Sequence, residues 1–299
     1  MVRNFDELVK AVENAPKSTV AVAAAEDMDV INIASACEKL ADFIFIGEAK
    51  KIESLIKESG KNIKGEIIDI PDHALAAAKA VELVKSGRAQ NLMKGLLHTA
   101  VFLKAILNKE TGINKGRLIS QLLVFEKQDK SGFQILTDCA INIAPTLAEK
   151  KEIIENAADV ARILGYEKPR VAVLAALEIV NPEMPATMDA AALAVMSQRG
   201  QIKNAIVDGP LALDNALDAE AAKHKGLNSP VAGNADILLA PNIEVGNTLG
   251  KALVFWANRK TAAAMPGVEI PVIANSRTET LENKILTVAL SAYMSLKRS

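Results

Sequence analysis

The sequence has few of the residue types that mark several common functional classes. Aromatic residues make up 3% of the 299 positions, histidine occurs three times, cysteine twice, and the formal net charge is −1. A chain so close to neutrality has no large field with which to attract nucleic acid or a membrane surface. We therefore expect neither as a partner, and any anionic ligand must be held by local arginines, lysines and backbone N–H groups.

Long apolar runs and targeting signals are also missing. No uninterrupted apolar run reaches the ~18 residues that a membrane-spanning helix needs. The first residues carry charges every few positions and lack the apolar core of a signal peptide. Cys37 and Cys139 each lie in an apolar segment, as buried free thiols do in a reducing compartment. These features predict a cytoplasmic protein.

The familiar motifs of nucleotide, hydrolase and metal sites do not occur. The sequence contains neither G-x-G-x-x-G after a strand nor G-x-x-x-x-G-K-[ST], and it has no G-x-S-x-G elbow. His73, His98 and His224 lie far apart and have no C-x-x-C or H-E-x-x-H companion. We expect no metal, so any chemistry must use Ser, Arg, Lys, Asn and carboxylates.

What the sequence does contain is an alternation of short apolar segments with helical patterns. The predicted strands lie within 18–26, 42–48, 65–71, 89–95, 170–177, 204–210, 235–241 and 268–275. Strands that alternate with helices predict βαβ units and mostly parallel sheets, which is an α/β fold. Near the middle the pattern changes: segments 117–127 and 132–142 predict a hairpin, and a long charged helix follows at 147–165. We predict a first α/β domain of residues 1–138 plus 281–299 and a second of residues 139–280.

Polar residues collect where the predicted strands end. Ligands of open parallel sheets bind outside the carboxyl ends of the strands. The candidate substrate-binding residues at these ends are Lys94, His98, Thr99, Asn181, Asp208, Ser229, Gly233, Asn242, Glu244 and Asn247. Each of them also suits a turn or a helix cap. Their concentration on one edge of the predicted sheets is what favours a binding site.

The segment Asn275-Ser276-Arg277 ends the last predicted strand just before a helical pattern. A guanidinium at a helix start opposes the positive end of the helix dipole, which amounts to about half a charge. An anion bound there offsets that cost and gains backbone N–H donors. The junction is therefore predicted to be an anion site.

Four segments resemble the phosphate acetyltransferase/phosphate butyryltransferase family, and the resemblance covers nearly the whole chain. They are "LMKGLLHTAVFLKAIL" (92–107), "VDGPLALDNAL" (207–217), "SPVAGNADILLAPNIEVGNTLGKAL" (229–253) and "IANSRTETLENK" (273–284). The stretch from Leu177 to Ile202 is closer to the butyryl branch. The resemblance implies two α/β domains around a cleft, as in isocitrate/isopropylmalate dehydrogenases.

The same resemblance implies a reaction. Members of the family reversibly transfer an acyl group between coenzyme A and inorganic phosphate through a ternary complex without an acyl-enzyme. Coenzyme A is then a substrate, no cofactor is bound permanently, and the protein is a homo-oligomer, a dimer or higher.

The resemblance also implies roles for individual residues. Arg277 would hold the phosphate, and Ser276 would donate a hydrogen bond to the reacting carbonyl oxygen. The position of the family's proposed base, seven residues after the serine, is Asn283 here, and neighbouring carboxylates are Glu279 and Glu282. Glu282 is the candidate base if the function has moved by one position. Lys94 and His98 are further candidates near the thiol, which local positive charge could hold as thiolate.

Three alternatives remain open on the sequence. The acyl group can be acetyl or another short or branched chain, because one methylene discriminates by only about 1–3 kcal/mol. An acyltransferase acting on acyl carrier protein is disfavoured by the lack of a basic patch. A non-catalytic two-domain protein that closes on a small anion belongs to a different class and needs an assay to separate it.

Overall fold

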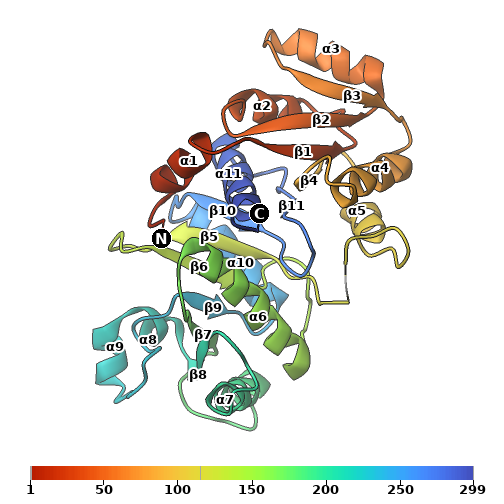
Figure 1. The fold of residues 1–299 in the computed structure, drawn as a ribbon. Coiled ribbons are helices and arrows are strands. Elements are labelled where there is room, and N and C mark those ends of the chain that lie inside the picture. Colours follow the sequence, from red (N-terminus) through yellow and green to blue (C-terminus); the bar gives the residue numbers. More distant parts are fainter. Residues whose placement is uncertain (1, 115, 299) are drawn as a thin grey trace. The chain divides into compact units, whose positions relative to one another are not determined.

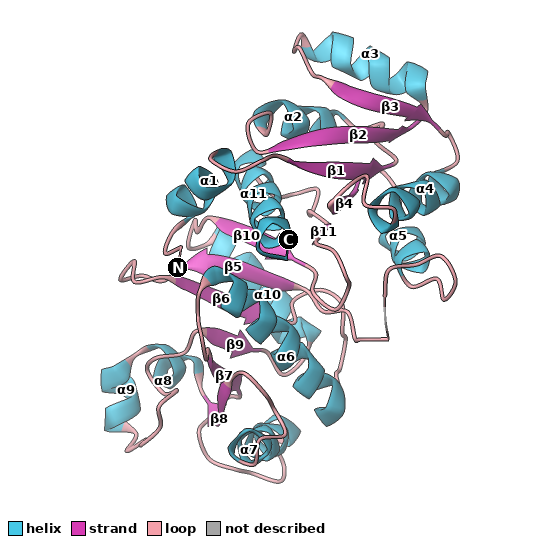
Figure 2. Ribbon diagram, in the orientation of Figure 1, coloured by secondary structure: helices cyan, strands magenta, loops and turns pink. Residues whose placement is uncertain are grey.

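The structure is a computed structural model that describes residues 2–114 and 116–298. Its residues form two compact units. The first, called the N-terminal unit, comprises Phe5–Arg117 and Ala262–Ser299, and the second, called the central unit, comprises Leu118–Thr261 with the residues up to Asn4. Figures 1 and 2 show the helices and strands of both. The domain assignment made from the sequence stays a prediction.

The N-terminal unit is built on a five-stranded sheet in the order β11-β4-β1-β2-β3, in which every pairing is parallel. The strands are β1 (Ser18–Ala23), β2 (Ala41–Gly47), β3 (Gly65–Asp69), β4 (Asn91–Lys94) and β11 (Val272–Ile273). The centre of β1 is fully buried, as expected for a parallel strand covered on both faces. All five strands therefore end at the same edge of the sheet.

The described residues of this unit form six helices: α1 (Phe5–Glu13), α2 (Met28–Ala36), α3 (Ala49–Ser59), α4 (His73–Lys85), α5 (Thr99–Ile106) and α11 (Leu281–Arg298). Short polar side chains begin two of them. Asp27 caps α2 by accepting from the Asp29 N–H, and Asp72 caps α4 by accepting from two backbone N–H groups. Such caps satisfy donors that the first turn of a helix leaves free.

The second sheet has six strands in the order β10-β5-β6-β9-β7-β8, and all of them except β10 belong wholly to the central unit. Its strands are β5 (Leu122–Glu126), β6 (Phe133–Thr137), β7 (Arg170–Leu174), β8 (Ile206–Leu211) and β9 (Ile237–Leu239), with β10 (Thr261–Ala264) where the chain leaves the unit. β5 and β6 pair antiparallel, which confirms the predicted hairpin, whereas β6, β9, β7 and β8 run parallel. The helices are α6 (Leu147–Leu164), α7 (Pro185–Gln198), α8 (Leu213–Leu217), α9 (Ala219–His224) and α10 (Ile243–Phe255).

Two mostly parallel sheets flanked by helices confirm the α/β class. The long charged helix is α6, and it begins with a capping box formed by Thr146 and Glu149. The sequence analysis missed β10, whose residues Thr-Ala-Ala-Ala carry no strand pattern. Both cysteines are free and buried, as predicted. Among the described residues, no helix combines the length and the apolar character needed to cross a bilayer.

Candidate functional site

A small pocket of the N-terminal unit lies where β4 and β11 end. It is lined by Asp27, Asp29, Val30, Ile33, Met93, Lys94, Gly95, Asn275, Ser276, Arg277 and Lys284. Its enclosed volume of about 30 Å³ admits little more than water. A larger ligand must therefore rest against the exposed rim, to which Ser276 and Arg277 belong.

Ser276 and Arg277 lie in the loop that follows β11, and both are exposed. Ser276 Oγ lies 3.1 Å from Thr278 Oγ1. The Arg277 guanidinium makes no hydrogen bond or ion pair with any residue that the structure describes. An exposed guanidinium with five free donors beside a hydroxyl can bind a phosphate through paired hydrogen bonds.

The structure corrects one premise of the anion prediction. Helix α11 begins at Leu281, four positions after Arg277, and its first turn is capped by Thr280, whose Oγ1 accepts from the Asn283 N–H at 3.2 Å. The helix dipole acts only within about the first turn. The dipole argument for Arg277 is therefore wrong, and the case for an anion here rests on the unpaired guanidinium itself.

Lys94 is the last residue of β4 and is about half buried. Its ammonium donates to the carbonyl oxygens of Gly95 and Leu97, at 3.2 Å each. Burial lowers the pKa of Lys94, the positive charge of Arg277 lowers it further, and Asp27 acts in the opposite direction. Lys94 and Arg277 thus form a positive pair at this pocket.

Lys284, which the sequence analysis missed, lines the same pocket. Its residue exposure is 4%, and its Nζ contacts Asp29 Oδ2 at 2.7 Å and the backbone oxygen of Arg277 at 3.4 Å. The signal was available, because Lys284 stands four residues before Val288 on the buried face of α11. Lys284 links α2, α11 and the Arg277 backbone.

Asn275 contributes an unusual feature to the same pocket. Both its Oδ1 and its Nδ2 are buried and have no hydrogen-bond partner among the described residues. Buried polar side chains are bonded in the large majority of cases, to protein or to water. The amide therefore points to a bound water or to a ligand group.

The other predicted residues of this unit do not line the pocket. His98 is the N-cap of α5 without a side-chain cap bond, and Thr99 is the first residue of that helix. Glu282 is exposed in the first turn of α11, whereas Asn283 is buried inside the same helix, with 3% exposure. The pocket brings Lys94, Ser276 and Arg277 together and leaves these four outside.

Several predicted residues of the central unit make turns and caps. Asn242 caps α10 by accepting from the Val245 N–H at 3.0 Å, and Glu244 lies in the first turn of that helix. Asn247 Nδ2 donates to the Cys139 carbonyl at 3.0 Å. Asn242 and Asn247 thus have structural partners, whereas Glu244 is exposed at the start of its helix.

The segment after α9 is held in the same manner. Ser229 Oγ accepts from the Val231 and Ala232 N–H groups, at 3.1 and 3.3 Å. Gly233 has φ of 73°, in the left-handed region, and a Cβ there would lie 2.4 Å from Ala219 Cα. Only glycine fits this turn.

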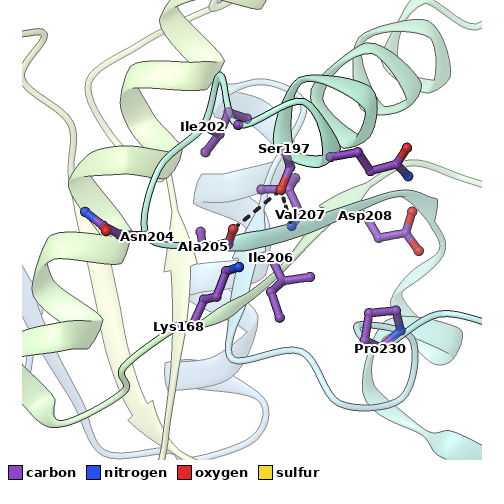
Figure 3. A pocket seen from close by; sticks show the side chains of 11 residues that line it. Lys168, Ser197, Ile202, Asn204, Ala205, Ile206, Val207, Asp208 and Pro230 are labelled. Carbon is purple, nitrogen blue, oxygen red and sulfur yellow. Dashed lines mark hydrogen bonds between the residues drawn. The ribbon is translucent and has the colours of Figure 1, made fainter.

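Asp208 lines a different pocket of the central unit, with a volume of about 340 Å³ (Figure 3). Figure 3 shows Ser197 at its wall, where Oγ donates to the Ala205 carbonyl and accepts from the Val207 N–H. Lys168 lines the pocket from the segment before β7. The last predicted residue, Asn181, holds the loop before α7, because its Oδ1 accepts from the Glu183 N–H at 3.0 Å.

Comparison with known proteins shows the family of the chain. The model of the phosphate acetyl/butaryl transferase family matches residues 72–292. A phosphate butyryltransferase of Clostridium acetobutylicum is 43% identical over 297 residues, which is 98% of this chain and 99% of the relative. The chain belongs to this family. A phosphate acetyltransferase of Thermotoga maritima is also similar, 42% identical over 96% of this chain and 98% of its own length.

Solved structures agree with membership of the phosphate acetyl/butaryl transferase family. A branched-chain phosphotransacylase from Enterococcus faecalis matches with a TM-score of 0.83 at 32% identity, over 93% of this chain and 99% of that one. A 4-hydroxythreonine-4-phosphate dehydrogenase from Klebsiella pneumoniae matches with a TM-score of 0.52 at 12% identity, over 94% of this chain and 100% of its own, which shows the fold alone. The predicted dehydrogenase-like fold is thereby confirmed.

Proposed function

We propose that this protein reversibly transfers a butyryl group between coenzyme A and inorganic phosphate, giving butyryl phosphate and free coenzyme A. The observation that carries the proposal is the unpaired Arg277 guanidinium beside Ser276 at the rim of the pocket, in a chain of the phosphate acetyl/butaryl transferase family. Arg277 binds the phosphate dianion through paired charge-assisted hydrogen bonds.

Ser276 acts on the other substrate. Its hydroxyl donates to the thioester carbonyl oxygen, where negative charge grows as phosphate attacks, and one well-aimed donor is worth a few kcal/mol. Ser276 Oγ contacts Thr278 Oγ1 and, among the described residues, no imidazole or carboxylate that could deprotonate it. A serine without a base is a poor nucleophile. This supports direct attack by phosphate without an acyl-enzyme.

The proposal extends to the setting of the reaction. Coenzyme A is a substrate and no permanently bound cofactor is needed. We expect the enzyme to work in the cytoplasm as a homo-oligomer. The exposed Phe255 and Trp256 at the end of α10, 59% and 86% accessible, support an assembly of the central unit.

Thiol release tests the proposal directly. Purified protein is incubated with butyryl-, isobutyryl- or acetyl-coenzyme A, with and without phosphate, and free thiol is followed with a chromogenic reagent. The protein's own thiols should stay silent, because both cysteines are buried and burial raises the pKa of Cys37 to about 12.

We expect phosphate-dependent release, fastest with butyryl-coenzyme A. Arsenate in place of phosphate should also release thiol, since acyl arsenates hydrolyse. Faster turnover of acetyl-coenzyme A would make the enzyme a phosphate acetyltransferase. Absence of thiol from all three thioesters would overturn the transferase, and calorimetric binding of phosphate would then favour the anion-binding protein.

A further inference from the structure

Two lysines line the pocket beside Ser276 and Arg277, and they differ in their partners. Lys284 is neutralised by Asp29 at 2.7 Å. Lys94 makes no ion pair with any carboxylate among the described residues, and its ammonium is held only by the carbonyl oxygens of Gly95 and Leu97. Two acceptors occupy two of its three protons, which leaves one for a ligand.

We propose that Lys94 carries the proton to and from the coenzyme A sulfur in this enzyme. The inference rests on the proposed function. It assigns the proton transfer to a lysine, because the two carboxylates of the pocket, Asp27 and Asp29, already accept from the Asp29 N–H and from Lys284. Lys94 is the last residue of β4, which pairs with β11 in the sheet. It therefore lines the same pocket as Ser276 and Arg277, which follow β11.

The residues near the position of the expected base do not serve this role. Asn283 carries an amide, which takes no proton at neutral pH, and it is buried inside α11. Glu282 is exposed in the first turn of that helix and does not line the pocket. Asp29 is already bonded to Lys284.

The surroundings of Lys94 suit a group that must give up a proton. The charged side chains that line the pocket with it are Asp27, Asp29, Arg277 and Lys284. Burial lowers the pKa of Lys94 and Arg277 lowers it further, while Asp27 opposes them. A lysine with a lowered pKa is a better acid than an exposed lysine and is nearer to the range useful in catalysis.

The proton balance is complete with the substrates alone. An oxygen of hydrogen phosphate forms a bond to the thioester carbon, the C–S bond breaks, and its electron pair passes to sulfur. The Lys94 ammonium gives its proton to that thiolate, which yields free coenzyme A. The neutral amine then recovers a proton from the hydrogen acyl phosphate, and in reverse the amine takes the proton of the thiol.

Three variants of the full-length protein test the inference by steady-state kinetics with butyryl-coenzyme A and phosphate. Lys94→Ala should lower kcat by about 10²-fold or more, with the KM for phosphate changed little. Lys94→Arg keeps the charge but gives up no proton, because the guanidinium stays protonated in proteins, so it should stay equally slow. Lys104→Ala removes an exposed lysine of α5 outside the pocket and should match the wild type.

Two further measurements separate proton transfer from structural support. Ethylamine in the buffer should restore part of the activity of Lys94→Ala and leave Lys94→Arg unchanged. With butyryl-seleno-coenzyme A, whose selenol is a much stronger acid than the thiol, the gap between wild type and Lys94→Ala should shrink at least about tenfold.

Near-wild-type kcat in Lys94→Arg, or in Lys94→Ala, would overturn the role of Lys94, and so would an unchanged gap with the seleno substrate. If Lys94→Ala does not fold, as seen by circular dichroism, the kcat of Lys94→Arg decides, together with the gap between wild type and Lys94→Arg on the seleno substrate, which should also shrink. Wild-type protein that releases no thiol at all would instead refute the proposed function, so the two failures are distinguishable.

Discussion

The two units each hold a cluster of charged side chains, and the clusters differ in how completely their polar groups are paired. In the central unit, Asp236 precedes β9 and has 4% exposure. Its Oδ1 contacts Lys127 Nζ at 2.7 Å, and its Oδ2 accepts from the Arg170 N–H and Nε at 2.9 and 3.0 Å. Every charge in this cluster has a partner.

The pocket of the N-terminal unit shows the opposite state. Arg277 has no partner among the described residues, Lys94 has no carboxylate, and the buried amide of Asn275 is unsatisfied. Asp236 and Arg170 lie where β9 and β7 begin, whereas the pocket lies where β4 and β11 end. Ligands bind at the carboxyl ends of parallel strands. The fully paired cluster thus lies at the strand starts, whereas the unpaired groups lie at the edge where we propose that phosphate binds.

Removing Asp236 should give the largest loss of stability. Asp236→Ala leaves two cations without their anion, and breaking a buried pair costs about 3–5 kcal/mol. Lys127 and Arg170 keep 17% and 34% side-chain exposure, which screens them, so we expect the low end of that range. Chemical denaturation should show the loss, while kcat per folded molecule stays unchanged. Glu183→Ala, an exposed acid of the same unit, is the matched control.

The same denaturation experiment, repeated at decreasing pH, tests whether the stabilisation depends on the charge of Asp236. Burial raises the pKa of Asp236, but the hydrogen bonds from Arg170 and Lys127 outweigh it, so its folded pKa lies below the ordinary value. Such a group stabilises the fold above the unfolded pKa of ~3.9 and loses that contribution as pH falls through the folded pKa. The gap between wild type and Asp236→Ala should therefore close in acid. A constant gap would show that the cluster does not depend on its carboxylate.

Arg277→Ala should give the converse result, a loss of activity without a loss of stability. The guanidinium holds nothing in the described structure, so denaturation should be unaffected. Losing a charge-assisted contact to the reacting phosphate should raise the KM for phosphate and lower kcat/KM about 10²-fold. Arg162→Ala, an exposed arginine of α6, is the control. Unchanged phosphate kinetics would remove Arg277 from the site.

The sequence alone predicts the regular parts of this protein well, for physical reasons. Buried parallel strands need continuous apolar runs, so nearly every strand was visible. β10 was not, because alanines carry little preference for a strand. The residue that caps α11 is not visible in the sequence, because Ser276, Thr278 and Thr280 can all cap a helix, and the structure shows Thr280 in this role.

Contacts between distant residues are what a single sequence does not reveal. Lys284 contacts Asp29, which lies 255 positions earlier. The spacing to Val288 places Lys284 on the buried face of α11, but nothing in the sequence identifies Asp29 as its partner. That Lys94 and Arg277 lie close together follows in the same way from the strand order β11-β4-β1, which the sequence does not show. The sequence singles out the Ser276-Arg277 segment through a dipole argument that the structure does not support, and its role in anion binding stays a prediction.

The pair Lys284–Asp29 is the intermediate case between the two clusters, and it should give the smallest effect. The Lys284 side chain is 6% exposed and that of Asp29 is 52% exposed. Asp29→Asn leaves a buried ammonium without its anion and should cost about 1–2 kcal/mol, whereas Lys284→Met leaves only an exposed carboxylate and should cost less. Lys284→Met should lower the enzymatic activity more than Asp29→Asn does, because Lys284 also contacts the backbone of Arg277. Equal stability losses in the two variants would mean that a buried Lys284 ammonium without its anion costs no more than an exposed Asp29 carboxylate without its cation. That result would contradict the prediction.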